Sequence, residues 1–412
     1  MARVSDVAAF SGAGLLRGAS LIALLGSAGT AAGFWLERRT TYFAYLTAFS
    51  FATSIALGAL IFLMTTYVVN AKWNIVLRRL NEGISMVLVV LAALFVPIAV
   101  GLRHLYLWTQ SAPELPEREL QVLHHRQAYL NTPFFLIRTL VYFLIWGGAA
   151  LALWSWSLRK DARARTHAGA EPALPSRAAE AEGGTPERTF SAALLVPVCL
   201  ALTFASFDWL MSLEPLWSST MFGVYYFAGG FVGSFGLLSV LGYYAQRGAG
   251  LNELIRPPHF HALGRLMLGF VIFWAYCAFF QAMLVQIANK PDEVRFYLLR
   301  IAGGFRWLTG VLAVTHFVLP FFVLLPRSIK FRSGVMALVG AWILMAHYLD
   351  MLWLVLPVQG MQGPLSLFWY LCALASIGGI CVAFATLLLR GKTLIPVGDP
   401  ELGQSIAYRS PT

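Results

Sequence analysis

Apolar runs of about 20 residues recur along the whole chain. Runs of that length can cross a hydrocarbon core of roughly 30 Å as helices. They do not alternate polar and apolar positions, and open sheet edges are not stable in lipid. The pattern therefore predicts an all-α polytopic membrane protein. The ten expected transmembrane helices are 17–36, 42–69, 84–104, 133–158, 190–213, 219–245, 261–288, 297–325, 333–356 and 365–390.

The composition agrees with this class, because 58% of the residues are hydrophobic and only 12% are charged. A soluble domain carries roughly 25% charged residues. The net charge of +11 is interpreted as an orientation signal rather than as a nucleic-acid surface, since Lys and Arg favour cytoplasmic connections. With the N-terminus inside, the inner segments hold 19 Lys and Arg and the outer segments hold 8. We therefore expect both termini in the cytoplasm.

Two connections differ from simple turns. Residues 159–189 have almost no large apolar side chain, which predicts a disordered cytoplasmic linker. Residues 105–130 form a long outer connection that contains the run His124-His125-Arg126. Long loops of this kind usually cover a site or dock a partner.

The cysteines and the N-terminus change the picture little. The four cysteines lie in apolar runs without CxxC spacing, so they are interpreted as buried apolar residues, and no metal site is expected. They are Cys199, Cys277, Cys372 and Cys381. No short hydrophobic segment with a small-residue cleavage site follows Met1, and no cleaved signal peptide is expected.

The chain contains a weak internal repeat. Asp208 and Asp350 each precede a proline by seven positions, with Leu two residues after the Asp. Arg138 and Arg300 lie at the outer entry of the helix before each Asp-bearing helix. Expected helices 2–5 would thus match helices 6–9, and both blocks enter from the outside. This predicts two four-helix bundles related by a parallel repeat, with helices 1 and 10 flanking them.

The repeat sets the expected organisation of the chain. We expect an N-terminal region with the first flanking helix, three helices of the first bundle, the linker, the helix that completes this bundle, the second bundle, the last flanking helix and a cytoplasmic tail. The corresponding ranges are 1–41, 42–158, 159–189, 190–213, 219–356, 365–390 and 391–412.

Ionisable side chains inside the membrane are costly and mark candidate sites. His347 and Asp350 are spaced i, i+3, so they share one helix face. His347 and His316 are both about 15 Å deep, near the midplane, and Asp208 and Asp350 are about 10 Å below the outer surface. An imidazole beside a carboxylate suits proton transfer, because burial and mutual charge move both groups towards neutrality. We therefore expect His347, Asp350, His316 and Asp208 to form a proton relay or to contact a quinone head group.

Each of these residues also has a purely structural interpretation. His347 and Asp350 could form an interhelical polar clamp, and Asp208 could pair with Arg138 or Arg300. Arg306 beside Gly303-Gly304 could make a close helix contact and bind a head group, or form an ion pair. The common depth of His316 and His347 would also allow a haem b, although membrane b-haem proteins usually carry more histidine pairs.

Several motifs resemble one family, the second large membrane subunit of bacterial alternative complex III, a quinol:cytochrome c oxidoreductase. It belongs to the NrfD/polysulfide-reductase-type membrane subunits. The resemblance covers nearly the whole chain, including Ala71-Lys72-Trp73 and Gly101 to Trp108 with His104. The other motifs are Phe207-Asp208-Trp209-Leu210-Met211-Ser212-Leu213-Glu214-Pro215, Phe222-Gly223-Val224-Tyr225-Tyr226-Phe227-Ala228-Gly229, His261-Ala262-Leu263-Gly264-Arg265, Phe273-Trp274-Ala275-Tyr276 and Pro396-Val397-Gly398-Asp399-Pro400.

The resemblance implies the ten-helix fold and a place in the bacterial inner membrane. It implies partners: multihaem and monohaem c-type cytochromes and an iron–sulfur protein, which carry the redox groups, and a homologous quinol-site subunit. A terminal oxidase would be a further partner. The chain itself would bind no redox cofactor, and would contribute to quinol interaction or proton translocation. His104, Arg138, Arg300 and Arg306 would be candidate quinone contacts. Where the family often has His-Asp-Leu-Gly, this chain has His261-Ala262-Leu263-Gly264, which weakens proton entry there.

Two other functions fit the residues. The chain could be a proton-coupled secondary transporter, although matched helix breaks at midplane are missing from its halves. It could also be a purely structural membrane anchor. In either case we expect a multi-pass membrane protein without nucleic-acid partners.

Overall fold

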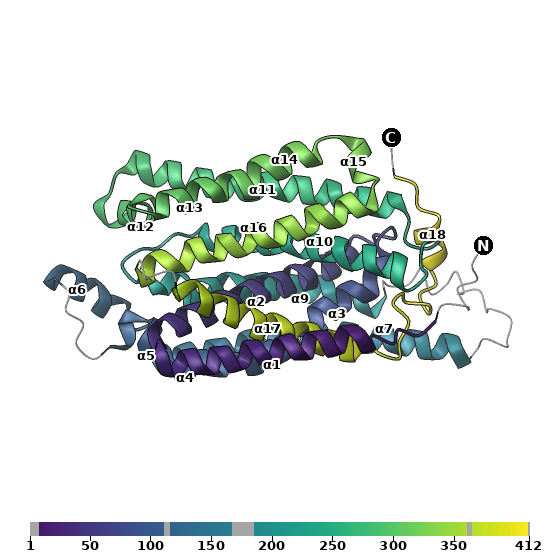
Figure 1. Ribbon diagram of the computed structural model, residues 1–412, viewed down its shortest axis with the longest axis horizontal. Coiled ribbons are helices and arrows are strands. Elements are labelled where there is room, and N and C mark those ends of the chain that lie inside the picture. Colours follow the sequence, from purple (N-terminus) through teal and green to yellow (C-terminus); the bar gives the residue numbers. More distant parts are fainter. Residues whose placement is uncertain (1–7, 111–115, 167–184, 361–364, 411–412) are drawn as a thin grey trace.

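The computed structural model describes residues 8–110, 116–166, 185–360 and 365–410, and every regular element in these ranges is a helix. Within them, 10 helical spans are long and apolar enough to cross a membrane. They lie roughly parallel along the long axis of the molecule (Figure 1). The predicted class, an all-α polytopic membrane protein, is confirmed. The helices that form these spans are α1 (Ala13–Leu36), α2 (Arg38–Val68), α3 (Ile75–Leu94) with α4 (Val96–Val100), α7 (Thr132–Thr166), α9 (Pro186–Trp209), α10 (Phe222–Gly248), α11 (Pro257–Ala288), α13 (Phe305–Leu312) with α14 (Leu319–Leu324), α16 (Ser333–Gln359) and α17 (Leu365–Leu389).

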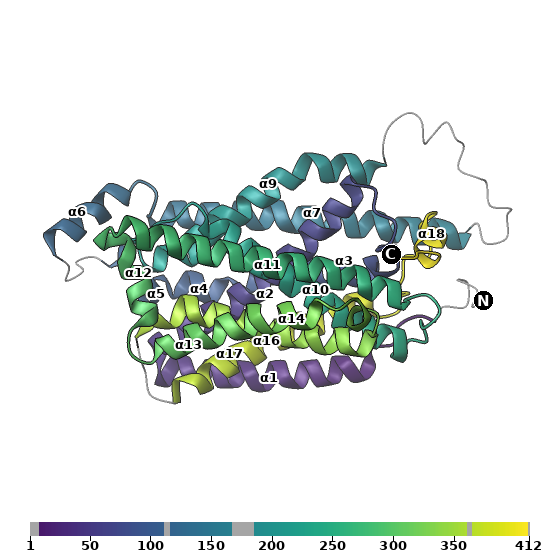
Figure 2. The same ribbon diagram turned by 90° about the horizontal axis from the view of Figure 1, so that it is seen from above.

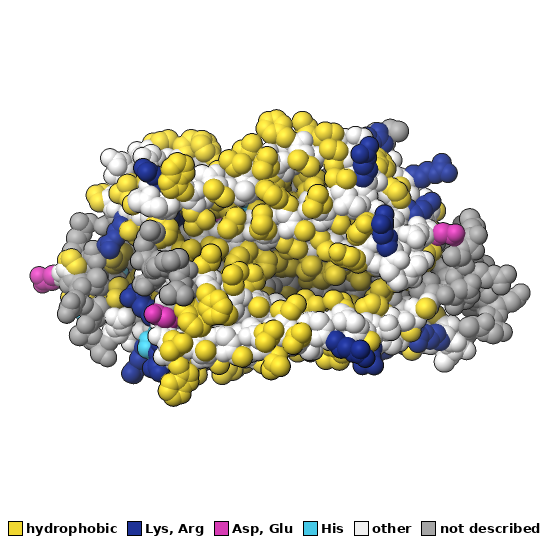
Figure 3. Space-filling model, viewed as in Figure 1, with side chains coloured by type: hydrophobic (Ala, Val, Ile, Leu, Met, Phe, Trp, Pro, Cys, Tyr) yellow, Lys and Arg dark blue, Asp and Glu magenta, His cyan; other side chains and the backbone are white. Residues whose placement is uncertain are grey.

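The two ends of the molecule are distinct. Both chain termini lie at one end, which we call the terminal end, together with α18 (Leu402–Ile406) (Figure 2). The opposite end carries α5 (Leu102–Leu105), α6 (Glu117–Arg126) and α12 (Pro291–Ile301), and we call it the α6 end. Hydrophobic side chains cover the middle of the face in Figure 3, while Lys, Arg, Asp and Glu lie towards the two ends. This distribution suits a protein surrounded by lipid.

The spanning helices form two rings of four. In the first ring α2 packs on α3, α3 on α7, α7 on α9, and α9 on α2. In the second, α10 packs on α11, α11 on α14, α13 on α16, and α16 on α10. Helices α2 and α10 both run from the α6 end to the terminal end, so the two bundles have the parallel order that the repeat predicts.

Contacts between the two bundles centre on α2 and α10, and the flanking helices form a pair. Helix α10 packs on α2 and α9 of the first bundle, and α16 also contacts α2. Helices α1 and α17 pack along each other and against α2, and the hydroxyl oxygens of Ser27 and Ser376 are 2.8 Å apart.

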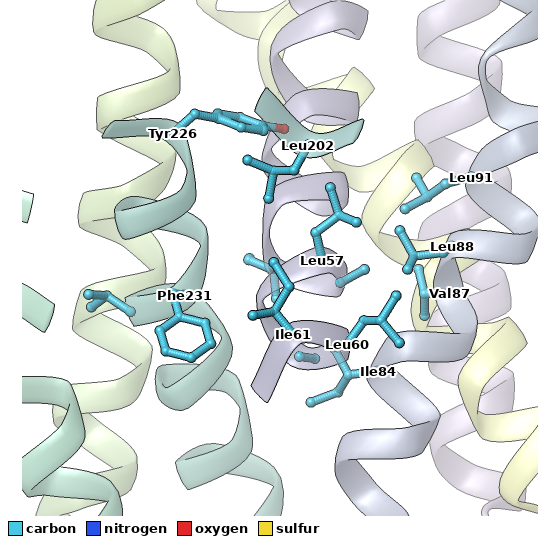
Figure 4. Packing of buried hydrophobic residues seen from close by; sticks show 14 of the residues in the cluster. Leu57, Leu60, Ile61, Ile84, Val87, Leu88, Leu91, Leu202, Tyr226 and Phe231 are labelled. Carbon is cyan, nitrogen blue, oxygen red and sulfur yellow. The ribbon is translucent and has the colours of Figure 1, made fainter. Parts of the chain in front are cut away.

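The first bundle has an apolar core. Leu57 and Leu60 of α2 face Ile84, Leu88 and their neighbours on α3 (Figure 4). Leu57, Leu60 and Leu88 are fully buried. In lipid these side chains gain little from leaving water, so close packing holds the helices together.

Helix α3 begins nine residues before the predicted start at residue 84, which corrects the sequence analysis. Arg78 and Arg79, expected in an inner connection, therefore lie in α3 and are buried. Arg78 pairs with Asp399, and Arg79 pairs with Asp161 and Glu82. The carboxylates neutralise the arginines, which permits a helix to begin where charge alone would indicate a loop.

The predicted linker at 159–189 is also partly wrong. Helix α7 continues to Thr166, and α9 already begins at Pro186, so both ends of the expected linker are helical. The buried pair of Asp161 with Arg79 and the partly exposed pair of Glu187 with Lys160 hold these helical ends in place. The remaining part, 167–184, lies outside the described residues.

The predicted helix 297–325 is interrupted. Helix α12 ends at Ile301, Gly303 has φ +52°, and α13 begins at Phe305. A positive φ is readily adopted by glycine, which explains the break. Gly303 has open space around its Cβ position and Arg306 is exposed, so the close helix contact expected there is not formed.

Candidate functional site

Three of the predicted site residues meet inside the second bundle. His347 and Asp350 lie on α16, and His316 lies on the π-helical turn Ala313–Val318 between α13 and α14. All three are buried, with exposures of 0, 0 and 1% respectively. One ligand atom from each lies within 4.8 Å of those of the other two. The structure thus places three titratable side chains together in an apolar bundle.

The local backbone explains how the side chains fit. A π-helical turn adds a residue to a helical turn and commonly occurs at functional sites. Here it carries His316, whose ring centroid is 6.1 Å from that of His347. On the other side, α10 presents Gly229 to His347, where an added Cβ would lie 2.9 Å from the imidazole Cε1. A larger residue at 229 would displace the ring.

The hydrogen bonds of His347 leave one nitrogen free. Its Nε2 is 2.8 Å from the Ser54 hydroxyl oxygen, and that hydroxyl donates to the carbonyl oxygen of Phe51. The hydroxyl hydrogen is already used, so His347 Nε2 donates to Ser54 and carries a hydrogen. His347 Nδ1 then faces Asp350 Oδ2 at 3.8 Å. In neutral His347 this nitrogen has a lone pair, so the pair forms a natural place for an additional proton.

Two side chains donate hydrogen bonds to Asp350. The Tyr225 hydroxyl donates to Oδ1, and the Trp274 indole nitrogen donates to Oδ2 at 3.1 Å. Both hydrogen bonds fix the position of the carboxylate. Trp274 also packs on His316, with ring centroids 3.9 Å apart. Neither nitrogen of His316 has a hydrogen-bond partner among the described residues.

A small cavity lies beside Tyr225, on the side of the cluster that faces the α6 end. It has a volume of about 20 Å³ and is lined by Tyr225, Gln281, Tyr297 and apolar neighbours. A cavity of this size holds about one water molecule. It is therefore suited to passing a proton from Tyr225, and it is too small for a quinone ring.

On the side of the terminal end, the backbones of α10 and α16 are in close contact. An added Cβ at Gly340 of α16 would lie 2.4 Å from the carbonyl oxygen of Gly236 on α10. Gly340 precedes His347 by two helical turns, on the side of the terminal end. The two helices that carry Tyr225, His347 and Asp350 are therefore held together directly below the cluster.

The donor set could also hold a metal ion. The three side chains offer two imidazoles and one carboxylate, a set that divalent transition metals accept in proteins. A haem has less room here, because Trp274 packs on His316 with ring centroids 3.9 Å apart and Gly229 of α10 lies against the His347 ring. The same three side chains can also take up and pass on a proton.

Asp208, the fourth predicted relay residue, lies in the first bundle in a different setting. Its two carboxylate oxygens accept hydrogen bonds from Arg138 Nε and Nη2 at 2.8 and 2.7 Å. The Tyr142 hydroxyl donates to it at 2.8 Å. Asp208 is thus neutralised by Arg138, one of the two partners considered from the sequence.

The remaining candidates are not brought to the cluster centre. Arg300 pairs with Glu214 at 2.8 Å and donates to the carbonyl oxygen of Leu354, and Arg306 is exposed. His104, expected inside the membrane, is exposed on α5 and stacks on Tyr42 with centroids 5.1 Å apart. Partial burial and the nearby Arg38 lower the pKa of His104, so its neutral form is favoured.

The sequence analysis did not predict a buried cluster of charged side chains in the first bundle, in the half nearer the terminal end. It joins Arg79, Glu82 and Asp161, with exposures of 0, 1 and 5%. Arg79 Nη1 is 3.0 Å from Glu82 Oε2, while Glu82 Oε1 has no partner among the described residues. The i, i+3 spacing of Arg79 and Glu82 at the edge of an apolar run was the available signal.

No protein-family model matches the sequence, and no curated protein matches it. The fold and the buried groups therefore define a class, a ten-helix polytopic membrane protein with a histidine–carboxylate cluster.

Proposed function

We propose that this chain is a membrane subunit of a quinol:cytochrome c electron-transfer complex of the alternative complex III type, in which its second bundle transfers protons. The observation that carries the proposal is the buried cluster of His316, His347 and Asp350, linked by Tyr225 to a cavity of one-water size. Motif resemblance supplies the electron-transfer setting. Redox groups would belong to cytochrome and iron–sulfur partners.

The geometry supports proton transfer by this cluster over quinone binding within it. His347 Nδ1 and Asp350 Oδ2 can share a proton after a small movement from their separation of 3.8 Å. Tyr225 can pass it to a water in the small cavity, which lies on the side of the α6 end. In the bacterial inner membrane, with the terminal end cytoplasmic, this path would exchange protons with the outer side.

The first experiment is Asp350→Asn in the intact complex. Asparagine preserves size and removes the proton-binding charge, so we expect quinol:cytochrome c activity, and the rate of proton release with it, to fall on the order of 100-fold, the low end of a general acid–base contribution. Glu401→Gln, at an ion pair that is about one-third exposed, is the control and should leave both unchanged. Unchanged rates in Asp350→Asn would remove this residue from the mechanism.

Purification tests separately whether the chain belongs to an electron-transfer complex. The chain isolated in mild detergent should bring c-type haem, visible in a reduced-minus-oxidised spectrum, and an iron–sulfur subunit. A colourless, solitary chain that takes up a substrate in liposomes would indicate the secondary transporter instead. Normal assembly and turnover in every buried-charge variant would indicate a structural anchor.

A further inference from the structure

His316, the member of the buried cluster that lies on the π-helical turn, has no hydrogen-bond partner among the described residues. Its side chain is 1% exposed, and both Nδ1 and Nε2 are buried and unpaired there. A buried polar group normally has a partner, either in the protein or in an ordered water or ion. A neutral imidazole always keeps a lone pair on one nitrogen. His316 therefore offers a buried lone pair for which the described part of the chain supplies no donor.

Two more lone pairs face the same place, on His347 and Asp350. His347 Nε2 donates to Ser54, so Nδ1 carries the lone pair, and Nδ1 is buried and unpaired among the described residues. Asp350 Oδ2 lies 3.8 Å from this nitrogen. Oδ2 accepts one hydrogen bond, from Trp274, and a carboxylate oxygen has two lone pairs. Each of the three side chains can thus give one electron pair to a common ligand.

The hydrogen bonds around these side chains resemble those around a metal centre. A histidine bound to a metal almost always donates its other ring N–H to a neighbouring acceptor, and a bound carboxylate is itself hydrogen-bonded. Here Ser54 accepts the N–H of His347, and Tyr225 donates to Oδ1 of Asp350, the oxygen that faces away from His347. These outer contacts fix the tautomer of the imidazole and the orientation of the carboxylate.

The spacing of the three ligand atoms is close to that around a bound ion. They lie within 4.8 Å of one another. Zinc is held by nitrogen and oxygen at about 2.0–2.2 Å in tetrahedral geometry, which places its ligand atoms roughly 3.4 Å apart. The cluster therefore has to close by about 0.5 to 1.5 Å to hold zinc. The His316 ring can turn to do so, because no hydrogen bond to the described residues holds it.

We propose that His316, His347 and Asp350 bind one divalent transition-metal ion of the zinc type. Two imidazoles and a carboxylate suit zinc, cobalt or ferrous iron, whereas magnesium and calcium prefer oxygen ligands. The carboxylate offsets one of the two charges of the ion. The ion and a transferred proton exclude each other, because both need the lone pair of His347 Nδ1. This exclusion rests on the proposed function, whereas metal binding itself does not.

The test is zinc binding to the purified full-length chain, with the subunits it retains, after removal of metals with a chelator and dialysis against micromolar zinc. Elemental analysis should find zinc that His316→Phe loses, because phenylalanine keeps a ring of similar size and removes the ligand. X-ray absorption at the zinc edge, which haem iron does not obscure, should show nitrogen and oxygen ligands at about 2.0–2.2 Å.

Two further variants give the test its controls. Ser54→Ala removes the hydrogen-bond partner of His347 Nε2, so zinc affinity should fall about 10- to 100-fold, the usual effect of losing such an outer contact. His104→Gln removes an exposed histidine on α5 and should leave the zinc content unchanged, which accounts for adventitious binding to surface histidines.

The outcomes separate the metal site from the proposed function. Absence of bound zinc, or zinc that His316→Phe retains in full, overturns the metal site. If His316→Phe fails to fold by gel filtration, Ser54→Ala decides alone, and unchanged affinity then overturns the proposal. Zinc binding is measured without turnover, so unchanged quinol activity in Asp350→Asn counts against proton transfer only, and absence of bound zinc counts against the metal site only.

Discussion

Arg138 binds both carboxylate oxygens of Asp208, through Nε at 2.8 Å and Nη2 at 2.7 Å. The repeat places Arg300 and Asp350 in the corresponding positions of the second bundle, but there Arg300 pairs with Glu214. Asp350 faces His347 instead. One copy of the motif is therefore a neutralised structural pair, and the other retains a carboxylate beside a titratable imidazole. The two copies of the Asp motif therefore have different partners: Asp208 pairs with Arg138, and Asp350 lies beside His347.

Asp208→Asn should destabilise the protein without a specific effect on proton transfer. The change leaves the Arg138 guanidinium buried without its counter-charge, which costs about 3–5 kcal/mol. Thermal unfolding in detergent measures the loss. The double variant Asp208→Leu/Arg138→Leu removes both charges and should be more stable than either single variant. Equal stability of Asp208→Asn and wild type would contradict a structural pair.

Tyr225→Phe should slow proton transfer while leaving the fold intact. The phenolic hydroxyl is the group that joins Asp350 to the small cavity. Without it, proton release should fall and the solvent isotope effect on turnover should rise, since proton transfer becomes rate-limiting. Both are measured on the intact complex in H₂O and D₂O.

The neighbouring tyrosine provides a matched control. Tyr226 is equally buried on the same helix, but its hydroxyl donates to the backbone oxygen of Ser50 at 2.7 Å. Tyr226→Phe loses one structural hydrogen bond, about 1 kcal/mol, and should keep the normal isotope effect. A similar isotope effect in both variants would show that Tyr225 has no special role.

Gly340→Ala should disrupt the close backbone contact between α10 and α16. The new Cβ would lie 2.4 Å from the carbonyl oxygen of Gly236, so the helices must separate. Overpacking of this kind costs roughly 1–3 kcal/mol, and thermal unfolding measures it. Gly334→Ala on the same helix meets its nearest neighbour at 3.6 Å and is the control. If both variants unfold at the same temperature, the contact at Gly340 is not tight.

Much of the fold was predictable because the lipid environment imposes simple rules. Long apolar runs marked all ten spans, and the i, i+3 spacing correctly placed His347 beside Asp350. His316 was expected with them on the basis of depth, and the structure brings it there, but the contact itself depends on a π-helical turn and on the rotation of α16, which the sequence position does not show. The depth of a residue along its helix follows from the local sequence, whereas the side chains that two helices turn towards each other depend on how the helices pack.

The errors have two causes. Arg78 and Arg79 indicated a connection because buried arginines are rare, yet Asp399 and Asp161 from distant parts of the chain neutralise them. His104 lies near the end of an apolar run, but the spanning helix already ends at Val100, and His104 lies exposed on the short α5. Local patterning shows neither the distant carboxylates nor this early helix end.

Asp399→Asn should loosen the terminal end, because the C-terminal tail joins the two bundles there. Asp399 pairs with Arg78 of α3, and both side chains are nearly buried, at 8 and 6% exposure. Further along, the Ser405 hydroxyl donates to the carbonyl oxygen of Trp73, and its own carbonyl is 2.9 Å from His259 Nε2 on α11. Removing the charge leaves Arg78 unpaired and should cost about 3–5 kcal/mol.

Amide hydrogen exchange locates this effect as well as measuring it. We expect faster exchange in the tail and in the first turns of α3 and α11, and unchanged exchange at the α6 end. Glu401→Gln is the control, because its ion pair with Lys72 is about one-third exposed and contributes at most about 1 kcal/mol. If Asp399→Asn exchanges no faster than Glu401→Gln, the buried pair does not hold the tail, and the hydrogen bonds of Ser405 do so instead.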